Sequence, residues 1–165
     1  MLAMPEQHFV LTGVNWQGYE SLLEAIGEQR VFITYDRGKV ELMSPSWEHD
    51  NRAETIGQLV RIIAEELDIA IKGGGSTTFR REDVDRGLEA DKCFYIRHER
   101  RVRGKKKIDL SVDPPPDLCI EVEISRRLLG RVSIYAELGV PELWRDDGKE
   151  LRIGELSARA GGRVG

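Results

Sequence analysis

The segment DLCIEVEIS, residues 117–125, alternates acidic and apolar side chains, and the fold prediction depends on it. In an extended strand, neighbouring side chains point to opposite faces. Two carboxylates about 7 Å apart on so apolar a strand are costly unless water, a cationic side chain or a metal ion neutralises them. The segment therefore predicts a strand with one aliphatic face and one acidic face. The aliphatic face would carry Leu118, Ile120, Val122 and Ile124, and the acidic face Asp117, Cys119, Glu121 and Glu123.

A second strand-like segment, LEADKCFYI at residues 88–96, places Asp91 in apolar surroundings. If the two strands are neighbours, Asp91 joins Glu121 and Glu123 at one point. Each acid alone favours a structural role: Asp91 as the end of a turn, and Glu121 in an ion pair. Three unpaired acids on apolar strands favour a functional role, because each one adds to the desolvation cost. The arginines available for such an ion pair are Arg126, Arg127 and Arg131.

Length and composition predict a single globular domain over residues 1–165, with flexible ends at 1–15 and 157–165. Charged residues make up 33% of the chain and hydrophobic residues 40%, which argues against disorder and against a membrane span. The first ten residues lack the pattern of a signal peptide, so the cytoplasm is the expected location. Cys93 and Cys119 are predicted to be buried free thiols rather than a disulfide.

Hydrophobic periodicity predicts the remaining elements. The expected helices cover residues 16–29, 47–67 and 125–138; the middle one has Ile56, Leu59, Val60, Ile63 and Leu67 on one stripe. The expected strands, besides the two acidic ones, cover residues 31–35, 39–43, 68–72, 77–81, 142–147 and 151–156, and Gly73–Gly75 is expected to form a turn. This order predicts an α/β protein with a mixed β-sheet flanked by helices.

The run RHERRVRGKKK, residues 97–107, is strongly basic, although the chain as a whole has a net charge of −4. A net negative charge is not typical of a generic nucleic-acid binder. A basic flap beside the acidic strands would nevertheless suit a polyanion held against a metal ion. The alternative is a solvated loop that only prevents aggregation. The candidate nucleic-acid contacts are Arg100, Arg101, Arg103, Lys105, Lys106 and Lys107.

Carboxylates predict a hard divalent ion as the cofactor. Mg²⁺ prefers oxygen ligands and is commonly held by one or two carboxylates together with water and substrate phosphate, and Mn²⁺ is an alternative. Asp91 and Glu121 would be the metal ligands, and Glu123 either a third ligand or the group that helps a water lose its proton. Zinc is disfavoured because the histidines are scattered and neither cysteine has a partner at metal-type spacing. These residues predict phosphodiester hydrolysis.

Several motifs resemble the Uma-type family of restriction endonuclease-like proteins. They are SPSWEHDNR at residues 44–52, Asp91 followed by the strand with Glu121-Val-Glu123, and IYAELGVPELWR at residues 134–145. The resemblance extends roughly from Val31 to Ile153. It implies the αβββαβ core of the PD-(D/E)XK nuclease superfamily, preceded here by a helix and a hairpin, and a Mg²⁺-dependent nuclease site. Asp91 stands at the first acid of the family and Glu121 at the second.

Two positions depart from the pattern that this resemblance implies. Ala90 replaces the proline that usually precedes the first acid, and Glu123 replaces the superfamily lysine two residues after the second acid. Arg131 is the candidate substitute for that lysine. An arginine can stabilise a phosphate, but it stays protonated and cannot act as a base.

Superfamily enzymes often place a further acid on the helix that corresponds to residues 47–67. Glu48, His49 and Glu54 are the candidates here. The alternatives are an exposed glutamate at position 54, and a cap or surface residue at position 49. Trp47 and Trp144 are expected in the core or at an interface.

The predicted function is Mg²⁺-dependent endonucleolytic cleavage of nucleic acid, with DNA as the expected substrate. A homodimer would place two cuts on opposite strands of a duplex. The first alternative is a catalytically inactive protein of the same fold that acts as a binding or regulatory module. The second is glycoside hydrolysis by a carboxylate pair, which is disfavoured because no aromatic cluster adjoins the acids.

Overall fold

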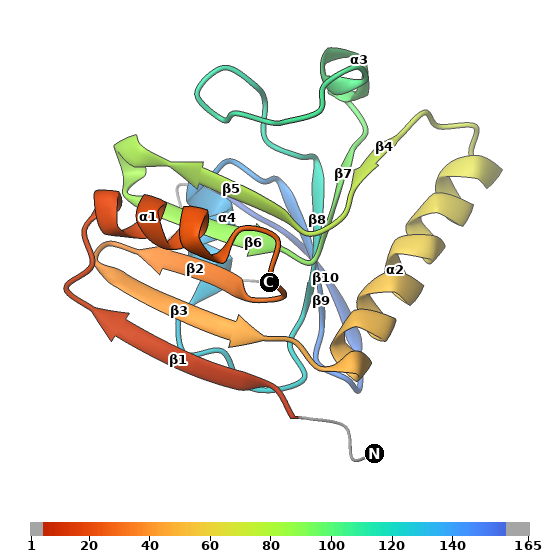
Figure 1. Cartoon of the computed structure of the whole chain (residues 1–165). Helices are drawn as coiled ribbons and strands as arrows, with labels where there is room; N and C mark the ends of the chain where they lie inside the picture. The colour runs from red at the N-terminus through yellow and green to blue at the C-terminus, as the bar shows by residue number, and fades with distance from the viewer. Residues whose placement is uncertain (1–4, 158–165) are drawn as a thin grey trace.

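The computed structural model describes residues 5–157, which form two five-stranded sheets and four α-helices (Figure 1). Neighbouring strands of sheet A are all antiparallel, whereas sheet B is mixed because β8 and β9 run parallel. Sheet A has the order β1 (Gln7–Thr12), β3 (Lys39–Ser44), β2 (Phe32–Asp36), β6 (Arg86–Ala90), β5 (Thr77–Arg81). Sheet B has the order β10 (Leu151–Glu155), β9 (Glu142–Asp146), β8 (Leu118–Val122), β7 (Lys92–Tyr95), β4 (Lys72–Gly74).

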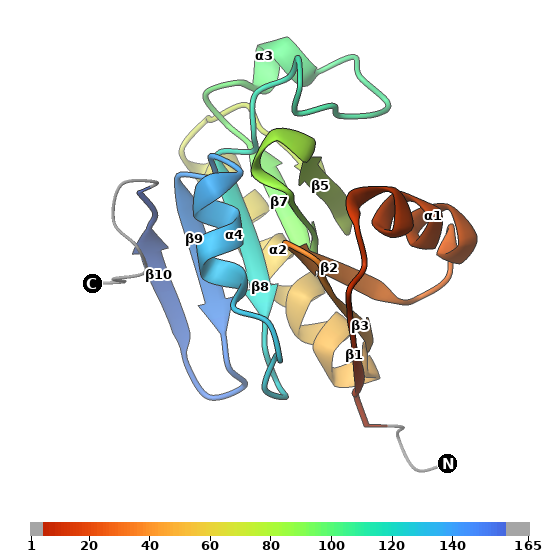
Figure 2. The ribbon, with the colours of Figure 1, turned by 90° about the vertical axis from the view of Figure 1, so that its left-hand side faces the viewer.

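Helices cover both faces of sheet B, which confirms the predicted mixed sheet flanked by helices. Figure 2 shows α4 (Arg131–Glu137) in front of β8 and β9 and α2 (Trp47–Glu66) behind them. Helix α1 (Trp16–Ile26) packs on sheet A through Tyr19, and α3 (Glu99–Val102) is a single turn. The fold is compatible with the restriction endonuclease-like class, and the antiparallel sheet A is an addition to the single sheet that the sequence predicted.

The two faces of β8 lie as the alternation predicted. Leu118, Ile120 and Val122 pack in the core beneath α2, whereas Cys119 packs in the core beneath α4. Cys93 and Cys119 are buried free thiols directly opposite each other in the register of β7 and β8, as expected. Burial raises the pKa of both thiols, so neither is readily ionised.

The chain around Asp91 forms two strands rather than the one that was predicted. Ala90 ends β6 in sheet A, and Lys92 begins β7 in sheet B, so Asp91 lies at the corner where the chain passes from one sheet to the other. The prediction was wrong here because the apolar alternation continues through the corner. A bend of this kind depends on tertiary pairing, which the local pattern does not encode.

Helix α2 has the predicted length but buries a different face. Its core positions are mostly small residues, which permit close approach to β7 and β8. Of the predicted stripe, Ile56 and Val60 are buried, but Leu59, Ile63 and Leu67 are exposed. Trp47 is 74% exposed, so of the two expected positions the core is excluded and the interface stays a prediction. The buried residues of α2 are His49, Ala53, Ile56, Gly57, Val60 and Ala64.

The last predicted helix is shorter than expected, because α4 begins only at Arg131. The buried carboxylate of Glu41 on β3 accepts hydrogen bonds from the backbone N–H groups of Leu128 and Leu129. Ser125 does not cap a helix; its hydroxyl bonds to His8 and to Glu6. Side chains from the N-terminal part of the chain thus hold residues 125–130 in an irregular path.

Two further segments differ from the predictions. Part of the expected flexible start, residues 7–12, is β1, which pairs along its whole length with β3. The short strand predicted at residues 68–72 is displaced into the glycines, where Lys72–Gly74 pairs with β7. Of the other expected flexible end, residues 158–165 lie outside the described residues. No helix within residues 5–157 is long and apolar enough to span a membrane.

Candidate functional site

Asp91, at the chain corner, lies beside the end of β8, the strand that carries Glu121. The pairing of β7 with β8 ends at Lys92 and Ile120, one residue short of Asp91 and Glu121. The Asp91 carboxylate continues the ladder beyond the last backbone pair, because its Oδ2 accepts the N–H of Val122 at 2.6 Å. The chain corner therefore positions the first predicted acid directly against the strand that carries the second.

His49, on the first turn of α2, is the nearest side chain to the other oxygen of Asp91. His49 is buried, and its Nε2 lies 3.3 Å from Asp91 Oδ1, an ion-pair contact rather than a well-aligned hydrogen bond. Burial by itself raises the pKa of Asp91, but the contact with His49 and the charges of Arg131 and Arg127 outweigh burial and lower it below the ordinary value. Asp91 is therefore a carboxylate at neutral pH.

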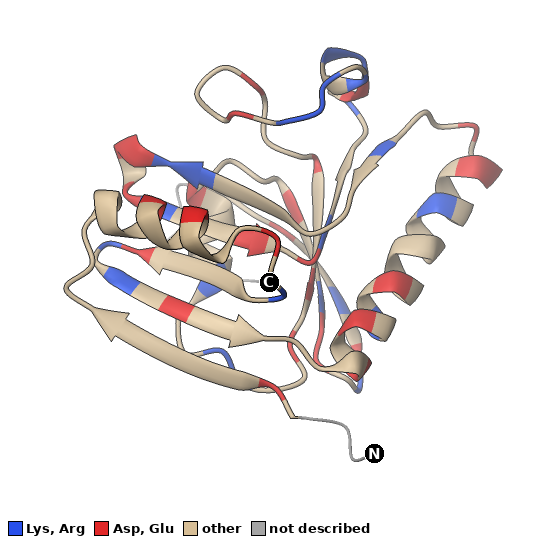
Figure 3. Cartoon of the chain, in the orientation of Figure 1, with Lys and Arg blue, Asp and Glu red and all other residues tan. Residues whose placement is uncertain are grey.

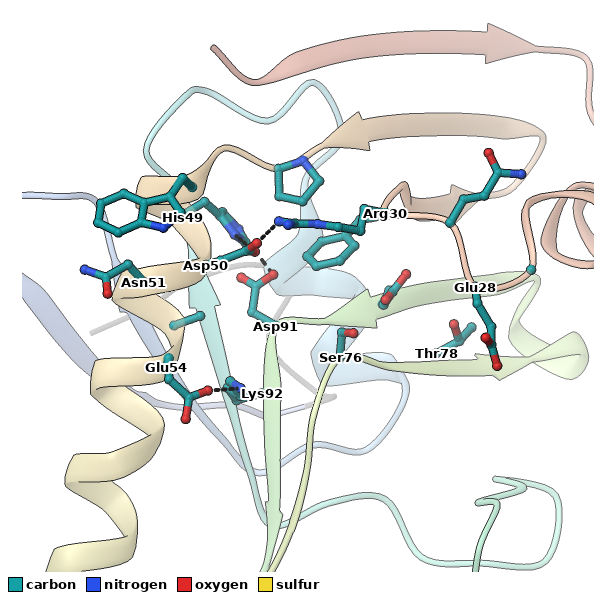
Figure 4. A pocket seen from close by; sticks show the side chains of 17 residues that line it. Glu28, Arg30, His49, Asp50, Asn51, Glu54, Ser76, Thr78, Asp91 and Lys92 are labelled. Carbon is teal, nitrogen blue, oxygen red and sulfur yellow. Dashed lines mark hydrogen bonds and ion pairs between the residues drawn. The ribbon is translucent and has the colours of Figure 1, made fainter. Parts of the chain in front are cut away.

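Asp91 and His49 line a pocket of 740 Å³ between the first turns of α2 and the ends of β2, β5 and β6, shown in Figure 4. We call it the acidic pocket. Its charged lining consists of five acids and two bases, namely Glu28, Asp50, Glu54, Glu89, Asp91, Arg30 and Lys92. Glu54 pairs with Lys92 at 2.6 Å and Asp50 pairs with Arg30, which leaves Asp91 at the inner wall with His49.

Glu121 lies on the α4 side of sheet B and is held by that helix. Arg131 Nε lies 2.6 Å from its Oε1, and Arg131 Nη2 donates to its Oε2 at 2.7 Å. The hydroxyl of Tyr135 donates to the same Oε2 at 2.7 Å. Burial alone would lower the pKa of Arg131, but the Glu121 charge raises it above the ordinary value, so Arg131 is a cation. Arg131 therefore does reach the predicted site, where it forms an ion pair with the second acid.

A second pocket, of 430 Å³, opens on this side of the sheet, and we call it the basic pocket. Its charged lining residues are Glu121, Glu123, Arg126, Arg127, Arg131 and Arg145. Glu123 follows the end of β8 and is partly exposed; its Oε2 lies 3.2 Å from Arg145 Nη2. The structure thus brings Glu121 and Glu123 to one pocket and Asp91 to the other, with the end of β8 between them.

Glu41 was not assigned a role in this region by the sequence, and Arg127 was named only as a possible structural ion-pair partner of Glu121. Glu41 is fully buried, and Arg127 Nη1 lies 3.7 Å from its Oε1. Arg127 Nε lies 3.6 Å from Glu121 Oε1, so this arginine lies between two carboxylates. The signal in the sequence was the acid in the apolar strand segment VELM, the same pattern that identified Glu121.

Asp91 and Glu121 are carboxylates, the kind of ligand that a hard divalent ion prefers. Asp91 Oδ1 and Glu121 Oε1 are both buried and have ion-pair contacts but no hydrogen bond within the described part of the chain. An ion would share Glu121 with Arg131. No group of three or more metal-binding side chains is arranged around a common point in residues 5–157. Any further ligands would therefore be water or substrate oxygens.

The basic run lies around α3, at the end of β7 and β8 remote from Asp91 and Glu121 (Figure 3). Two of its cations are paired, Arg103 with Glu99 and Lys105 with Asp113. The structure therefore separates the expected flap from the acids by the length of the strands. A role for the residues of this loop in binding nucleic acid remains a prediction, and it requires a ligand long enough to cover that distance.

Comparison with known families agrees with the class that the fold and the paired acids indicate. The Uma2 family, described as "Putative restriction endonuclease", matches residues 16–161. The chain therefore belongs to the Uma2 family, as its motifs predicted, and the family description indicates a nuclease. No curated protein and no solved structure gave a significant match.

Proposed function

We propose that this protein is a divalent metal-dependent endonuclease that hydrolyses phosphodiester bonds in DNA. The observation that supports this proposal is the hydrogen bond from the Val122 N–H, next to Glu121 on β8, to Asp91 Oδ2; each of the two acids also has one buried oxygen with no hydrogen bond within residues 5–157. These two carboxylates would hold Mg²⁺ or Mn²⁺. The bound ion would polarise the phosphate and lower the pKa of an attacking water.

The side chains around the two acids have distinct roles in this proposal. His49 holds the Asp91 carboxylate in place through its 3.3 Å contact. Arg131 lies against Glu121 and supplies fixed positive charge near the phosphate, but it cannot accept a proton. Glu123 is partly exposed in the basic pocket and can accept the proton of a water that enters there.

One observation favours the alternative of a non-catalytic module of the same fold. Arg131 contacts both oxygens of Glu121, and Tyr135 adds a third interaction with that carboxylate. A cation would have to compete with these partners. In that case the protein would bind nucleic acid without cutting it.

A cleavage assay distinguishes these two functions. Supercoiled plasmid, single-stranded DNA and single-stranded RNA are incubated with Mg²⁺, with Mn²⁺ or with EDTA. We expect metal-dependent cutting of DNA that falls at least about 100-fold in Asp91→Asn and in Glu121→Gln. The amide oxygen introduced by Asp91→Asn can still accept the Val122 N–H, so the fold is retained. Glu65→Gln, an exposed acid at the far end of α2 and outside the acidic pocket, is the matched control and should keep activity.

Calorimetric titration of the same proteins with Mg²⁺ gives the second measurement. Metal binding without cutting would support the non-catalytic module. The endonuclease proposal fails if no divalent ion binds, or if both acid substitutions leave cutting unchanged.

We further propose that the protein acts in the cytoplasm as a homodimer. Two buried free thiols suit a reducing compartment. A dimer would let two sites cut both strands of a duplex. Light scattering of the purified protein tests the dimer directly, and a monomeric mass at working concentration would contradict it.

A further inference from the structure

Arg127 is a buried cation whose hydrogen-bonding capacity is almost unused. The residue is 7% exposed, and neither Nη1 nor Nη2 has a hydrogen-bond partner in residues 5–157. Its contacts with Glu41 and Glu121 are ion pairs at 3.7 and 3.6 Å. A buried guanidinium normally satisfies its fork of five N–H donors, because each unpaired polar group costs about 1–3 kcal/mol. Arg127 therefore has donors left for a ligand.

Arg131, at the start of α4, uses both of its Nη atoms as hydrogen-bond donors in the same pocket. Besides its contacts with Glu121, it donates from Nη1 to Thr34 Oγ1 and from Nη2 to the carbonyl oxygen of Glu89, each at 2.6 Å. Neither Nη atom of Arg127 has such a partner within residues 5–157. Arg127 is therefore the buried arginine of the basic pocket that has unused hydrogen-bond donors.

The rest of the basic pocket favours an anion. Four arginines and two glutamates line it, which leaves an excess of two positive charges. Arg126 is exposed and has no ion pair within the described chain, and the side chain of Arg145 is 34% exposed at the pocket edge. The volume of 430 Å³ lies within the range of small-ligand sites, about 300–1,000 Å³. A phosphate group or one nucleotide fits such a space, whereas a duplex does not.

We propose that the basic pocket is a phosphate-binding site in which Arg127 makes the main contact and Arg126 and Arg145 close the rim. Guanidinium groups bind phosphate through paired N–H donors, which is the geometry that Arg127 has free. The phosphate can come from a free anion or from the terminal phosphate of a nucleic-acid strand. The inference deepens the proposed nuclease by placing a phosphate beside Glu121, but phosphate binding needs no metal.

The first test measures inorganic phosphate binding by calorimetry in the presence of EDTA, so that loss of nuclease activity cannot affect the result. We expect wild type and Asp91→Asn to bind phosphate equally. Arg127→Gln should weaken binding at least about tenfold, and Arg145→Gln about threefold. Arg152→Gln, an exposed arginine on β10 that does not line this pocket, is the control and should bind as wild type.

Circular dichroism checks that each variant is folded. If Arg127→Gln is not folded, the phosphate affinity of Arg145→Gln decides the result. The proposal is overturned if wild type shows no phosphate binding, or if the Arg127 or Arg145 substitution changes binding no more than Arg152→Gln. Failure of cleavage with intact phosphate binding overturns only the nuclease proposal.

The second test identifies the source of the phosphate. Fluorescence anisotropy compares one oligonucleotide with a 5′-phosphate and the same oligonucleotide with a 5′-hydroxyl, again in EDTA. Tighter binding of the phosphorylated strand, lost in Arg127→Gln, would identify a strand end. Equal binding of the two strands, combined with calorimetric binding of inorganic phosphate, would support the site with a free anion as its ligand.

Discussion

The acidic pocket and the basic pocket lie on either side of the end of β8 and carry opposite charge. Five acids and two bases line the first, and four arginines and two glutamates line the second. Asp91 belongs to one and Glu121 to the other, although Asp91 accepts a hydrogen bond from Val122, the residue next to Glu121. The molecule thus separates a pocket with an excess of acids from a pocket with an excess of arginines, and each pocket contains one of the two carboxylates.

The charges beside the basic pocket are more deeply buried than the Glu54–Lys92 ion pair of the acidic pocket, although Asp91 and His49 in that pocket are buried as well. In the acidic pocket the ion pair of Glu54 with Lys92 is largely exposed, with 59% of the glutamate side chain accessible. Beside the basic pocket, the side chains of Glu41, Glu121, Arg127 and Arg131 are all at most 4% exposed. Solvent screens an exposed pair, whereas a buried charge that loses its partner has no compensation. These four buried charges should therefore contribute more to stability than the Glu54–Lys92 ion pair does.

The largest expected effect is that of Glu41→Ala. The substitution leaves two backbone N–H groups without their acceptor and leaves the buried Arg127 with Glu121 as its remaining ion-pair partner. We expect the free energy of unfolding to fall by about 3–5 kcal/mol. Urea denaturation measures it, and Glu54→Ala is the matched control, with an expected loss of at most about 1 kcal/mol. Equal losses would contradict the difference in burial.

The second-largest expected loss of stability is that of Arg131→Lys. A lysine keeps the charge but cannot contact both oxygens of Glu121 and also reach Thr34 and the Glu89 carbonyl. We expect a loss of about 2–3 kcal/mol of stability together with tighter Mg²⁺ binding, because one Glu121 oxygen becomes available. Urea denaturation and calorimetric titration give the two values. Unchanged or weaker metal affinity would show that Arg131 does not compete with the ion, and Arg145→Lys is the control.

The smallest effect concerns Glu89, a partly buried acid of the acidic pocket. Burial raises its pKa, and the charge of Asp91 adds to this against the opposing hydrogen bond with Ser76. The stability that accompanies the raised pKa is fully present below the unfolded pKa of about 4.3 and is lost as the pH rises through the folded pKa. Glu89→Gln should therefore stabilise the protein by less than about 1 kcal/mol at pH 7 and by nothing near pH 4.

Thermal unfolding of wild type and Glu89→Gln between pH 4 and pH 8 measures this difference. A gap between the two melting temperatures that stays constant over this range would show that the charge of Glu89 is not its cause.

The sequence predicted most of the strands because their signals are local. Alternation in residues 117–125 identified both faces of β8. The chain corner was missed because LEADKCFYI contains no glycine or proline to mark it. The path of residues 125–130 depends on Glu41, which is more than 80 residues away along the chain. Sequence periodicity cannot reveal a contact of that kind.

The buried face of α2 shows a further limit. Both sides of this helix carry aliphatic residues, so the pattern alone did not decide between them. Close packing on β7 and β8 selects the side with Ala53, Gly57 and Ala64. Close packing against the sheet therefore determines which face of α2 is buried, and the hydrophobic pattern alone does not.

The corner at residue 91 has a consequence for any movement of the two sheets. One continuous stretch of backbone links β6 in sheet A to β7 in sheet B through this residue alone. A tilt of either sheet would change the backbone torsion angles on both sides of Asp91. The Asp91 carboxylate would turn with them. The separation between this carboxylate and that of Glu121 is thus the geometric quantity most sensitive to the angle between the sheets.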